Sequence, residues 1–215
     1  MVEVLDRDLA LPVGGGELAG DLLLPERARG LVVFAHGSGS SRHSPRNRWV
    51  AEQLREAGLG TLLIDLLTGG EDQVDARTRE LRFDIGLLSG RVSAVLDHLA
   101  GQPGGDLPLG LFGASTGAAA ALGAAAERPE AVRAVVSRGG RPDLAPDLGS
   151  VRAPSLLLVG GHDQQVLGMN QQAQQQLTAP CEVRVVPGAT HLFEEPGALE
   201  QVAETASDWF LEHLG

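Results

Sequence analysis

The chain has 215 residues, of which 43% are hydrophobic, with a formal net charge of −11 and a sequence pI near 4.9. This length suits one α/β domain with a sizeable core, and no repeat or change of composition divides it. We therefore expect a single domain over residues 1–215. The acidic balance argues against a nucleic-acid partner or an anionic membrane surface. No apolar run approaches the length of about 18 residues that a membrane span needs.

Residue types that are rare or missing exclude several chemistries. All 17 basic residues are arginine, which leaves no lysine for a Schiff base. The one cysteine, Cys181, cannot form an internal disulfide, which fits a reducing compartment, and we expect a core or strand-edge thiol there. Because the first residues lack the basic and apolar stretches of a signal peptide, we expect a cytoplasmic protein. Neither a metal nor an organic cofactor is predicted.

Short apolar runs alternate with helical patterns, which is typical of a mostly parallel sheet with helices on both faces. An antiparallel hairpin precedes this pattern, so the predicted fold is a three-layer α/β sandwich. The strands are expected over Val2–Leu11, Glu17–Leu24, Gly30–Ala35, Thr61–Leu66, Leu107–Phe112, Val132–Ser137, Ser155–Val159 and Glu182–Val186. The helices are expected over Pro45–Ala57, Leu81–Leu99, Thr116–Glu127, Gln164–Leu177 and Pro196–Leu214.

Two of these helices carry predictions about the side chains at their starts. Ser44 is expected to cap the first helix, with Pro45 at the first helical position. Arg82 and Asp84 are expected to form a structural ion pair on the second helix.

The segment Gly113-Ala114-Ser115-Thr116-Gly117 joins a predicted buried strand directly to a predicted helix. A serine on such a tight turn has its hydroxyl thrust out of the backbone, and the two glycines leave room for the strained turn. The pattern GxSxG alone is a weak signal in a chain with 29 glycines. Its position between a strand and a helix is what makes Ser115 a candidate nucleophile.

A serine hydroxyl needs a base within hydrogen-bond reach, and the base needs a carboxylate that fixes its tautomer. Asp163 and His191 each follow the end of a predicted strand downstream of Ser115. In an open α/β sheet, reactive groups collect beyond the carboxyl ends of the strands. We therefore predict a catalytic triad of Ser115, Asp163 and His191. The alternative for Asp163 is a cap of the helix that begins near Gln164.

Acyl transfer also needs N–H donors aimed at the oxyanion of the transition state. The backbone N–H of Thr116, directly after the serine, is the first predicted donor. The second is expected from the loop after the strand Gly30–Ala35, as the N–H of Ser38. The alternative for this segment is an ordinary glycine-serine loop. His36 is expected to orient the loop and not to act as a second base.

These motifs resemble those of α/β-hydrolases, and the chain is similar to the dienelactone hydrolase-like group of small, lid-less hydrolases. The resemblance covers nearly the whole length and includes the chain order serine, aspartate, histidine. It rests on His36–Gly39, Gly113–Gly117, Gly160–Asp163 and Ala189–His191, and the segment Thr78–Leu88 also looks like that group. It implies hydrolysis through an acyl-enzyme. Dienelactone hydrolases proper carry a cysteine nucleophile, so Ser115 favours esterase-type chemistry over a dienelactone substrate.

The interval Arg138–Pro154, where lids of this superfamily usually lie, is short and polar, so we expect no substantial lid and no interfacial lipase. The expected substrates are small soluble carboxylic esters, thioesters or lactones. The arginines near the mouth could attract a carboxylated substrate or could pair with surface carboxylates. Candidate substrate contacts are His36, Gly37, Arg42 and Arg141. Arg46 and Arg48 are the other arginines just after the oxyanion loop.

Two functions from other classes stay open. A hydrolase-fold protein could bind a ligand or partner without turnover. The same triad could also transfer the acyl group to an acceptor other than water, as in an acyltransferase or perhydrolase. A homodimer could form through the edge at the Gly14 hairpin or through the last helix.

Overall fold

Aliphatic side chains fill the inner strands, and every residue of β3 (Leu31–Ala35), β4 (Gly60–Ile64), β5 (Leu109–Ala114) and β7 (Ser155–Gly160) is buried. Continuous apolar runs of this kind form strands that are covered on both faces. The computed structural model describes residues 4–102 and 104–215. The predicted first strand, Val2–Leu11, therefore begins outside the described residues.

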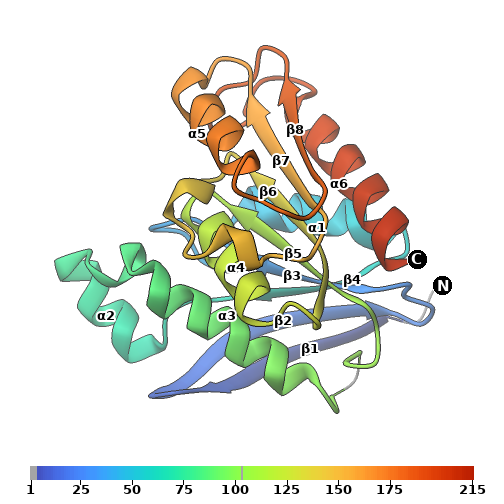
Figure 1. Ribbon diagram of the computed structural model, residues 1–215. Coiled ribbons are helices and arrows are strands. Elements are labelled where there is room, and N and C mark those ends of the chain that lie inside the picture. The colour runs from blue at the N-terminus through green and yellow to red at the C-terminus, as the bar shows by residue number, and fades with distance from the viewer. Residues whose placement is uncertain (1–3, 103) are drawn as a thin grey trace.

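The described strands form one sheet in the order β1-β2-β4-β3-β5-β6-β7-β8 (Figure 1). The remaining strands are β1 (Val4–Val13), β2 (Gly16–Pro25), β6 (Val132–Arg138) and β8 (Cys181–Val186), of which β1 and β8 form the two edges. β2 pairs antiparallel with both β1 and β4, whereas the pairs from β4 through β8 are parallel. The predicted α/β fold with an N-terminal antiparallel hairpin is confirmed.

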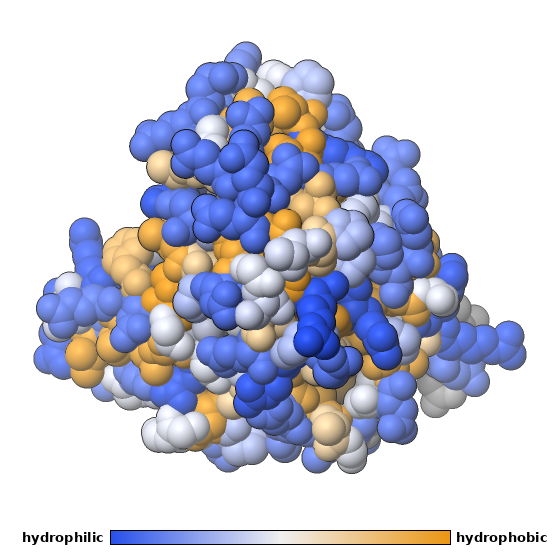
Figure 2. Space-filling model, viewed as in Figure 1, coloured by the Kyte–Doolittle hydropathy of each residue, from blue (hydrophilic) through white to orange (hydrophobic). Residues whose placement is uncertain are grey.

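The two faces of the sheet carry different helices (Figure 1). One face packs against α1 (Pro45–Glu56) and α6 (Ala198–Leu214), around the stacked rings of Phe34 and Phe112, whose centroids are 4.7 Å apart. The other packs against α3 (Ile85–Leu99), α4 (Thr116–Glu127) and α5 (Gln164–Gln174). Figure 2 shows this second face, where apolar surface is scattered among hydrophilic residues.

The helix α2 (Gly69–Thr78) was not predicted from the sequence; it follows β4 and precedes α3 along the chain. Its start is a capping box, in which the Thr68 side chain accepts from the Glu71 N–H and the Glu71 carboxylate accepts from the Thr68 N–H. Arg91 of α3 binds the Glu71 carboxylate and the carbonyl oxygen of Gly14, which ties α2, α3 and the hairpin together.

The start of α3 differs from the prediction. A short 3-10 turn precedes the helix, and α3 begins only at Ile85. The Asp84 carboxylate caps it by accepting from the Leu87 N–H at 3.0 Å. The predicted ion pair of Arg82 with Asp84 is therefore wrong. Arg82 instead donates from Nε to Oδ2 of Asp75 at 2.6 Å, because α2 brings that carboxylate within reach.

The interval between β6 and β7 contains only two short 3-10 turns, Pro142–Leu144 and Leu148–Ser150, in residues that are all described. No lid stands there, as the short polar sequence predicts. At this position no inserted segment therefore covers the carboxyl ends of β5, β7 and β8.

Candidate active site

The turn between β5 and α4 holds Ser115 in a backbone conformation that few side chains adopt, with φ 52° and ψ −121°. Glycine is required on both sides of it. A Cβ on Gly113 would lie 2.3 Å from the Cα of Ala118, and a Cβ on Gly117 would lie 2.3 Å from the carbonyl oxygen of Ala35. Strain of this kind is kept where the surrounding structure holds it, often at functional sites. The predicted strand–turn–helix arrangement around Ser115 is present.

The loops after β7 and β8 bring Asp163 and His191 together. The Nδ1 atom of His191 lies 2.7 Å from Oδ2 of Asp163. Gly160, at the end of β7, permits this approach, since a Cβ there would lie 2.4 Å from the carbonyl oxygen of Ala189. The Asp163 side chain makes no capping bond to α5. When Nδ1 carries the proton and donates it to Asp163, the Nε2 lone pair of His191 is free to act as a base.

Ser115 and His191 line the same cavity, which has a volume of about 240 Å³. It lies at the carboxyl ends of the parallel strands and also receives residues from the start of α1. Its other lining residues are Gly37, Ser38, Ser40, Ser44, Arg46, Asn47, Ala114, Arg138 and Leu192. The structure thus brings the predicted nucleophile and base to one cavity.

The predicted oxyanion loop lies against the nucleophile turn. A Cβ on Gly37 would lie 3.2 Å from the Cβ of Ser115, so only glycine approaches this closely without displacement. The backbone N–H of Ser38 donates to Oγ1 of Thr116 at 2.8 Å. This hydrogen bond joins the loop to the first residue of α4. The Ser38 N–H that we predicted as an oxyanion donor is therefore engaged by the Thr116 hydroxyl.

His36 fixes the other side of this loop. Its Nδ1–H donates to the carbonyl oxygen of Gly37 at 2.9 Å, and its Nε2 accepts from the backbone N–H of Leu66 at 3.3 Å. Burial lowers the pKa of His36, although the hydrogen bond to Gly37 and the charges of Asp65 and Asp72 oppose that shift. The ring therefore links the loop to the end of β4 in its neutral form.

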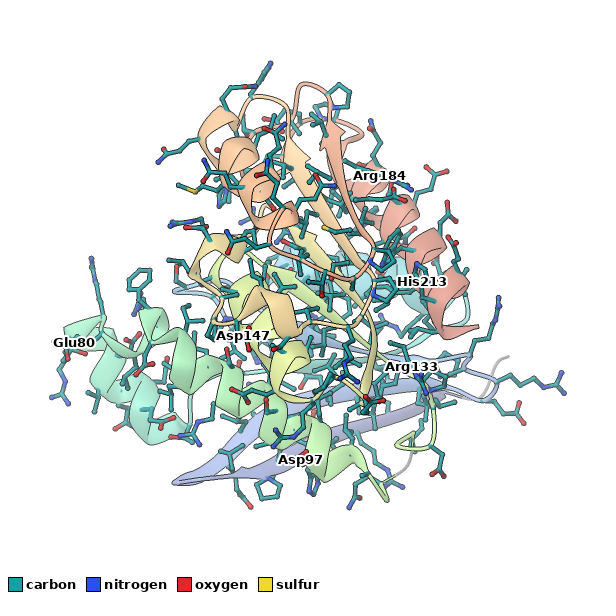
Figure 3. All side chains as sticks on the ribbon, viewed as in Figure 1. Glu80, Asp97, Arg133, Asp147, Arg184 and His213 are labelled. Atoms are coloured by element: carbon teal, nitrogen blue, oxygen red, sulfur yellow. The ribbon has the colours of Figure 1, made fainter. Side chains whose placement is uncertain are left out.

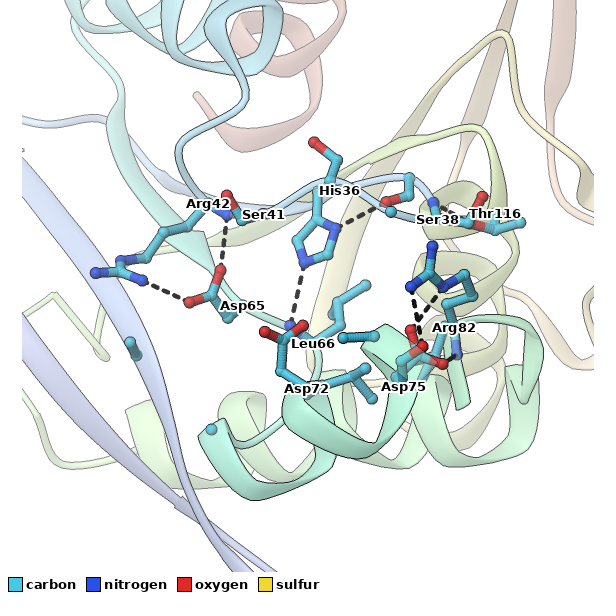
Figure 4. Close-up of a pocket in the computed structure, with 18 of the residues that line it drawn as sticks. His36, Ser38, Ser41, Arg42, Asp65, Leu66, Asp72, Asp75, Arg82 and Thr116 are labelled. Atoms are coloured by element: carbon cyan, nitrogen blue, oxygen red, sulfur yellow. Dashed lines mark hydrogen bonds and ion pairs between the residues drawn. The ribbon is translucent and has the colours of Figure 1, made fainter. Parts of the chain in front are cut away.

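A larger cavity, of about 440 Å³, lies on the other side of the loop (Figure 4). It shares Gly37, Ser38 and Ser40 with the smaller cavity, and α2 with the segment around Arg82 forms its opposite wall. Both charge signs line it, and its charged groups are Glu17, Arg42, Asp65, Asp72, Asp75 and Arg82.

The arginines that we named as candidate substrate contacts are mostly paired within the protein. Arg42 donates to Oδ1 of Asp21 at 3.0 Å and to Oδ2 of Asp65 at 2.5 Å. Arg141 pairs with Asp143 at 2.8 Å and lines neither of the two cavities. Arg42 thus lines the larger cavity, but Asp21 and Asp65 already balance the charge of its guanidinium.

Arg138, the last residue of β6, is a cavity residue that the sequence did not predict; it lines the cavity of Ser115 and is 7% exposed. Its Nη2 donates to Oδ1 of Asn47 at 3.2 Å. Burial, and secondarily the charge of Arg46, lower the pKa of Arg138 to about 10, so the group stays charged near neutral pH. The available signal was a charged residue that directly follows the apolar run of a buried strand.

Other parts of the molecule offer less chemistry. Burial, with the charge of Glu182 second, raises the pKa of the Cys181 thiol to about 11, which makes it a poor nucleophile. Across the described residues, no three His, Cys, Asp or Glu side chains are grouped so that they could hold a metal ion. Within the same part of the chain, no helix combines the length and apolar character needed to cross a membrane.

Comparison with known proteins identifies the family and the fold. Residues 26–141, more than half of the chain, match the family model described as serine aminopeptidase, S33. The crystal structure of a dienelactone hydrolase from Anabaena variabilis is similar over 99% of both chains, with 56% identity and a TM-score of 0.96. A dienelactone hydrolase-like phosphotriesterase from metagenomic libraries shares the fold at 20% identity, over 99% of both chains, with a TM-score of 0.79.

Curated relatives extend beyond this chain. Two Mycobacterium tuberculosis proteins, from strains CDC 1551 and H37Rv, are named provisionally as a phosphoribosyl transferase. Each is 60% identical over 211 residues, which are 97% of this chain and 47% of the relative. The chain therefore spans about half the length of the curated relatives it matches.

Proposed function

Because the chain belongs to the serine aminopeptidase S33 family and to the dienelactone hydrolase-like α/β-hydrolases, we propose that it is a serine hydrolase. Its proposed substrates are small carboxylic esters, thioesters or lactones. The observation that carries the proposal is the 2.7 Å hydrogen bond between His191 and Asp163, at a cavity that His191 shares with Ser115. The uncovered cavity mouth fits small soluble substrates better than lipid aggregates.

In the proposed reaction, Oγ of Ser115 attacks the ester carbonyl while Nε2 of His191 takes the hydroxyl proton. Asp163 holds the ring in the required tautomer and stabilises its positive charge. The tetrahedral intermediate collapses as His191 passes the proton to the leaving alcohol, and an acyl-enzyme remains. Water, deprotonated by His191, then attacks the acyl carbon and releases the acid with free Ser115.

The backbone N–H of Thr116 is the first proposed donor to the oxyanion, since it directly follows the nucleophile. The Ser38 N–H is the second. It donates to the Thr116 hydroxyl in the structure, so it must exchange this acceptor for the substrate oxygen. Thr116 would then act both through its amide and as the group that keeps the Ser38 amide in place before substrate arrives.

A panel of chromogenic esters of graded acyl length tests the proposal. We expect hydrolysis by the natural chain and labelling of Ser115 by a fluorophosphonate probe. Ser115→Ala should abolish the label and lower kcat by about 10⁶-fold, as in other serine hydrolases with a concerted triad. Ser150→Ala is the matched control, because this exposed serine hydrogen-bonds only to Asp147 and lies outside both cavities.

The outcomes separate the open alternatives. A fold that binds without turnover would leave the panel unhydrolysed and Ser115 unlabelled. An acyltransferase or perhydrolase would label Ser115 but would partition the acyl group to an added alcohol or peroxide in preference to water. Equal hydrolysis by the natural chain and Ser115→Ala would refute the proposal.

A further inference from the structure

The charge of the smaller cavity is opposite to that of the molecule. The chain carries a net charge of −11, yet the described residues that line the cavity of Ser115 include two arginines and no carboxylate. The neighbouring larger cavity is lined by four carboxylates, from Glu17, Asp65, Asp72 and Asp75. Two arginines and no carboxylate therefore line the space of the proposed reaction, while Asp163 and Glu194 contact the lining residues His191 and Arg46.

Arg138 is the more deeply buried of the two arginines, and no described carboxylate pairs with it. Its guanidinium contacts the Asn47 amide oxygen at 3.2 Å and lies 5.9 Å from the ring centroid of Phe193, both neutral groups. Its Nε has no hydrogen-bond partner among the described residues. A buried charge without a counter-charge is costly. An anion bound in the cavity would supply the counter-charge that Arg138 lacks.

Arg46, the second arginine, is held only weakly. Its Nη1 lies 3.0 Å from Oε1 of Glu194, a side chain that is 62% exposed. Ion pairs this exposed contribute little, so the guanidinium can exchange Glu194 for another anion. Because Arg46 also lowers the pKa of Arg138, an anion placed near both would relieve their mutual repulsion.

The start of α1 adds a third favourable feature. Ser44, Arg46 and Asn47 from this first turn line the cavity, and the turn contains no acidic residue. Ser44 caps the helix as predicted, by accepting from the Asn47 N–H at 3.4 Å. The N-terminus of a helix carries partial positive charge and favours anions.

We propose that Arg138, together with Arg46 and the start of α1, binds an oxyanion of the substrate, a carboxylate or a phosphate, close to the scissile carbonyl. The preferred substrates are then anionic esters, and Arg138 is a specificity-determining residue. This inference rests on the proposed function, because it names the substrate class of the same site.

A matched pair of esters measures the anion directly. Monoethyl adipate and ethyl hexanoate have acyl chains of the same length, and only the former carries a terminal carboxylate. We expect Arg138→Met to lower kcat/KM for monoethyl adipate by about 10- to 100-fold, the range for a lost charge-assisted hydrogen bond. Ethyl hexanoate should change by less than about threefold. A pH-stat records acid release from both esters.

Arg133→Met is the matched control. Arg133 lies on the same strand, β6, but is exposed and lines neither cavity (Figure 3). It should leave the ratio of the two kcat/KM values unchanged. Arg138→Met should also unfold at the same or a higher temperature, because it removes an uncompensated buried charge. Arg138→Gln, which keeps a donor for Asn47, replaces it if the methionine variant does not fold.

A binding experiment makes the test independent of turnover. Calorimetry on Ser115→Ala should detect the binding of adipate, of inorganic phosphate, or of both. The result shows which oxyanions the site accepts. The double variant Ser115→Ala/Arg138→Met should lose that binding.

Several results would overturn the inference. If Arg138→Met left the ratio of the two kcat/KM values unchanged, whether or not both values fell, Arg138 would have a structural role only. Absence of adipate and phosphate binding to Ser115→Ala would remove the anion site. If the natural chain hydrolysed neither ester but Ser115→Ala bound an anion through Arg138, the proposed function would fail and the anion site would stand.

Discussion

At the scale of single residues, Asp163 distinguishes a catalytic from a structural interpretation. It occupies the cap position before α5, where an aspartate ordinarily accepts a backbone N–H. Its side chain makes no such bond and instead contacts Nδ1 of His191 at 2.7 Å. Asp84 does the opposite, since its carboxylate caps α3 through the Leu87 N–H. The two aspartates thus form a natural pair for comparison.

Asp163→Ala is predicted to lower kcat for ester hydrolysis by about 10⁴-fold, the loss seen when a triad aspartate is removed elsewhere. Its stability should change little, because no capping bond is lost. Asp84→Ala should lower the free energy of unfolding by about 1 kcal/mol and keep activity. Urea unfolding and initial rates measure both. If Asp163→Ala destabilised the fold and kept activity, Asp163 would be a structural residue.

The sequence predicts Ser115, Asp163 and His191 because each follows a strand, and strand ends meet at one edge of a parallel sheet. It could not tell which arginine enters the cavity. Arg42 is close to the oxyanion loop along the chain, but Asp21 and Asp65 from β2 and the end of β4 reach its guanidinium. Arg138 stays without a carboxylate because its neighbours on α1 are Arg46 and Asn47. Partners of this kind depend on tertiary packing.

At the scale of elements, α2 shows where periodicity fails as a guide. Its sequence is polar and begins with two glycines, so it presents no apolar face. A local signal was present, since Thr68 is followed three residues later by Glu71, as in a capping box. Contacts made by Arg91 and Arg82 then hold the helix against the domain. Asp72 and Asp75 of α2 line the larger cavity, so this helix forms part of its wall.

We predict that Thr68→Ala lowers the free energy of unfolding by about 1 kcal/mol, since the cap of α2 is lost. Thr78→Ala places the same substitution at the last residue of α2, where alanine favours the helix and only a long, exposed hydrogen bond from the Glu80 N–H (3.4 Å) is lost. It should leave stability unchanged or slightly raised. Urea unfolding followed by circular dichroism compares the two variants. Equal losses would mean that the capping box does not hold α2.

At the scale of the whole molecule, alternating patterns predict the α/β class but not the order of the strands. The sheet places β4 between β2 and β3, so neighbours in space are not always neighbours in sequence. Some close contacts between loops also require glycine, as at Gly160, where a Cβ would lie 2.4 Å from the carbonyl oxygen of Ala189 in the loop of His191. Whether a glycine is flexible or closely packed is visible only once its neighbours in space are known.

The pH dependence of stability follows from groups spread over the molecule. Burial lowers the pKa of His36. Below about pH 6.5 the unfolded chain therefore binds a proton that the folded chain resists, and the free energy of unfolding decreases as the pH is lowered. Glu71 should give a second loss: burial raises its pKa, but hydrogen bonds from Thr68 and Arg91 lower it overall. Below about pH 4.5 the unfolded chain therefore binds a proton at Glu71 that the folded chain resists, and stability falls further. Chemical denaturation between pH 8 and about 3 should show both losses. His36→Gln should remove only the upper one, whereas His162→Gln, an exposed control, should retain it. An unchanged upper step in His36→Gln would assign it to another group.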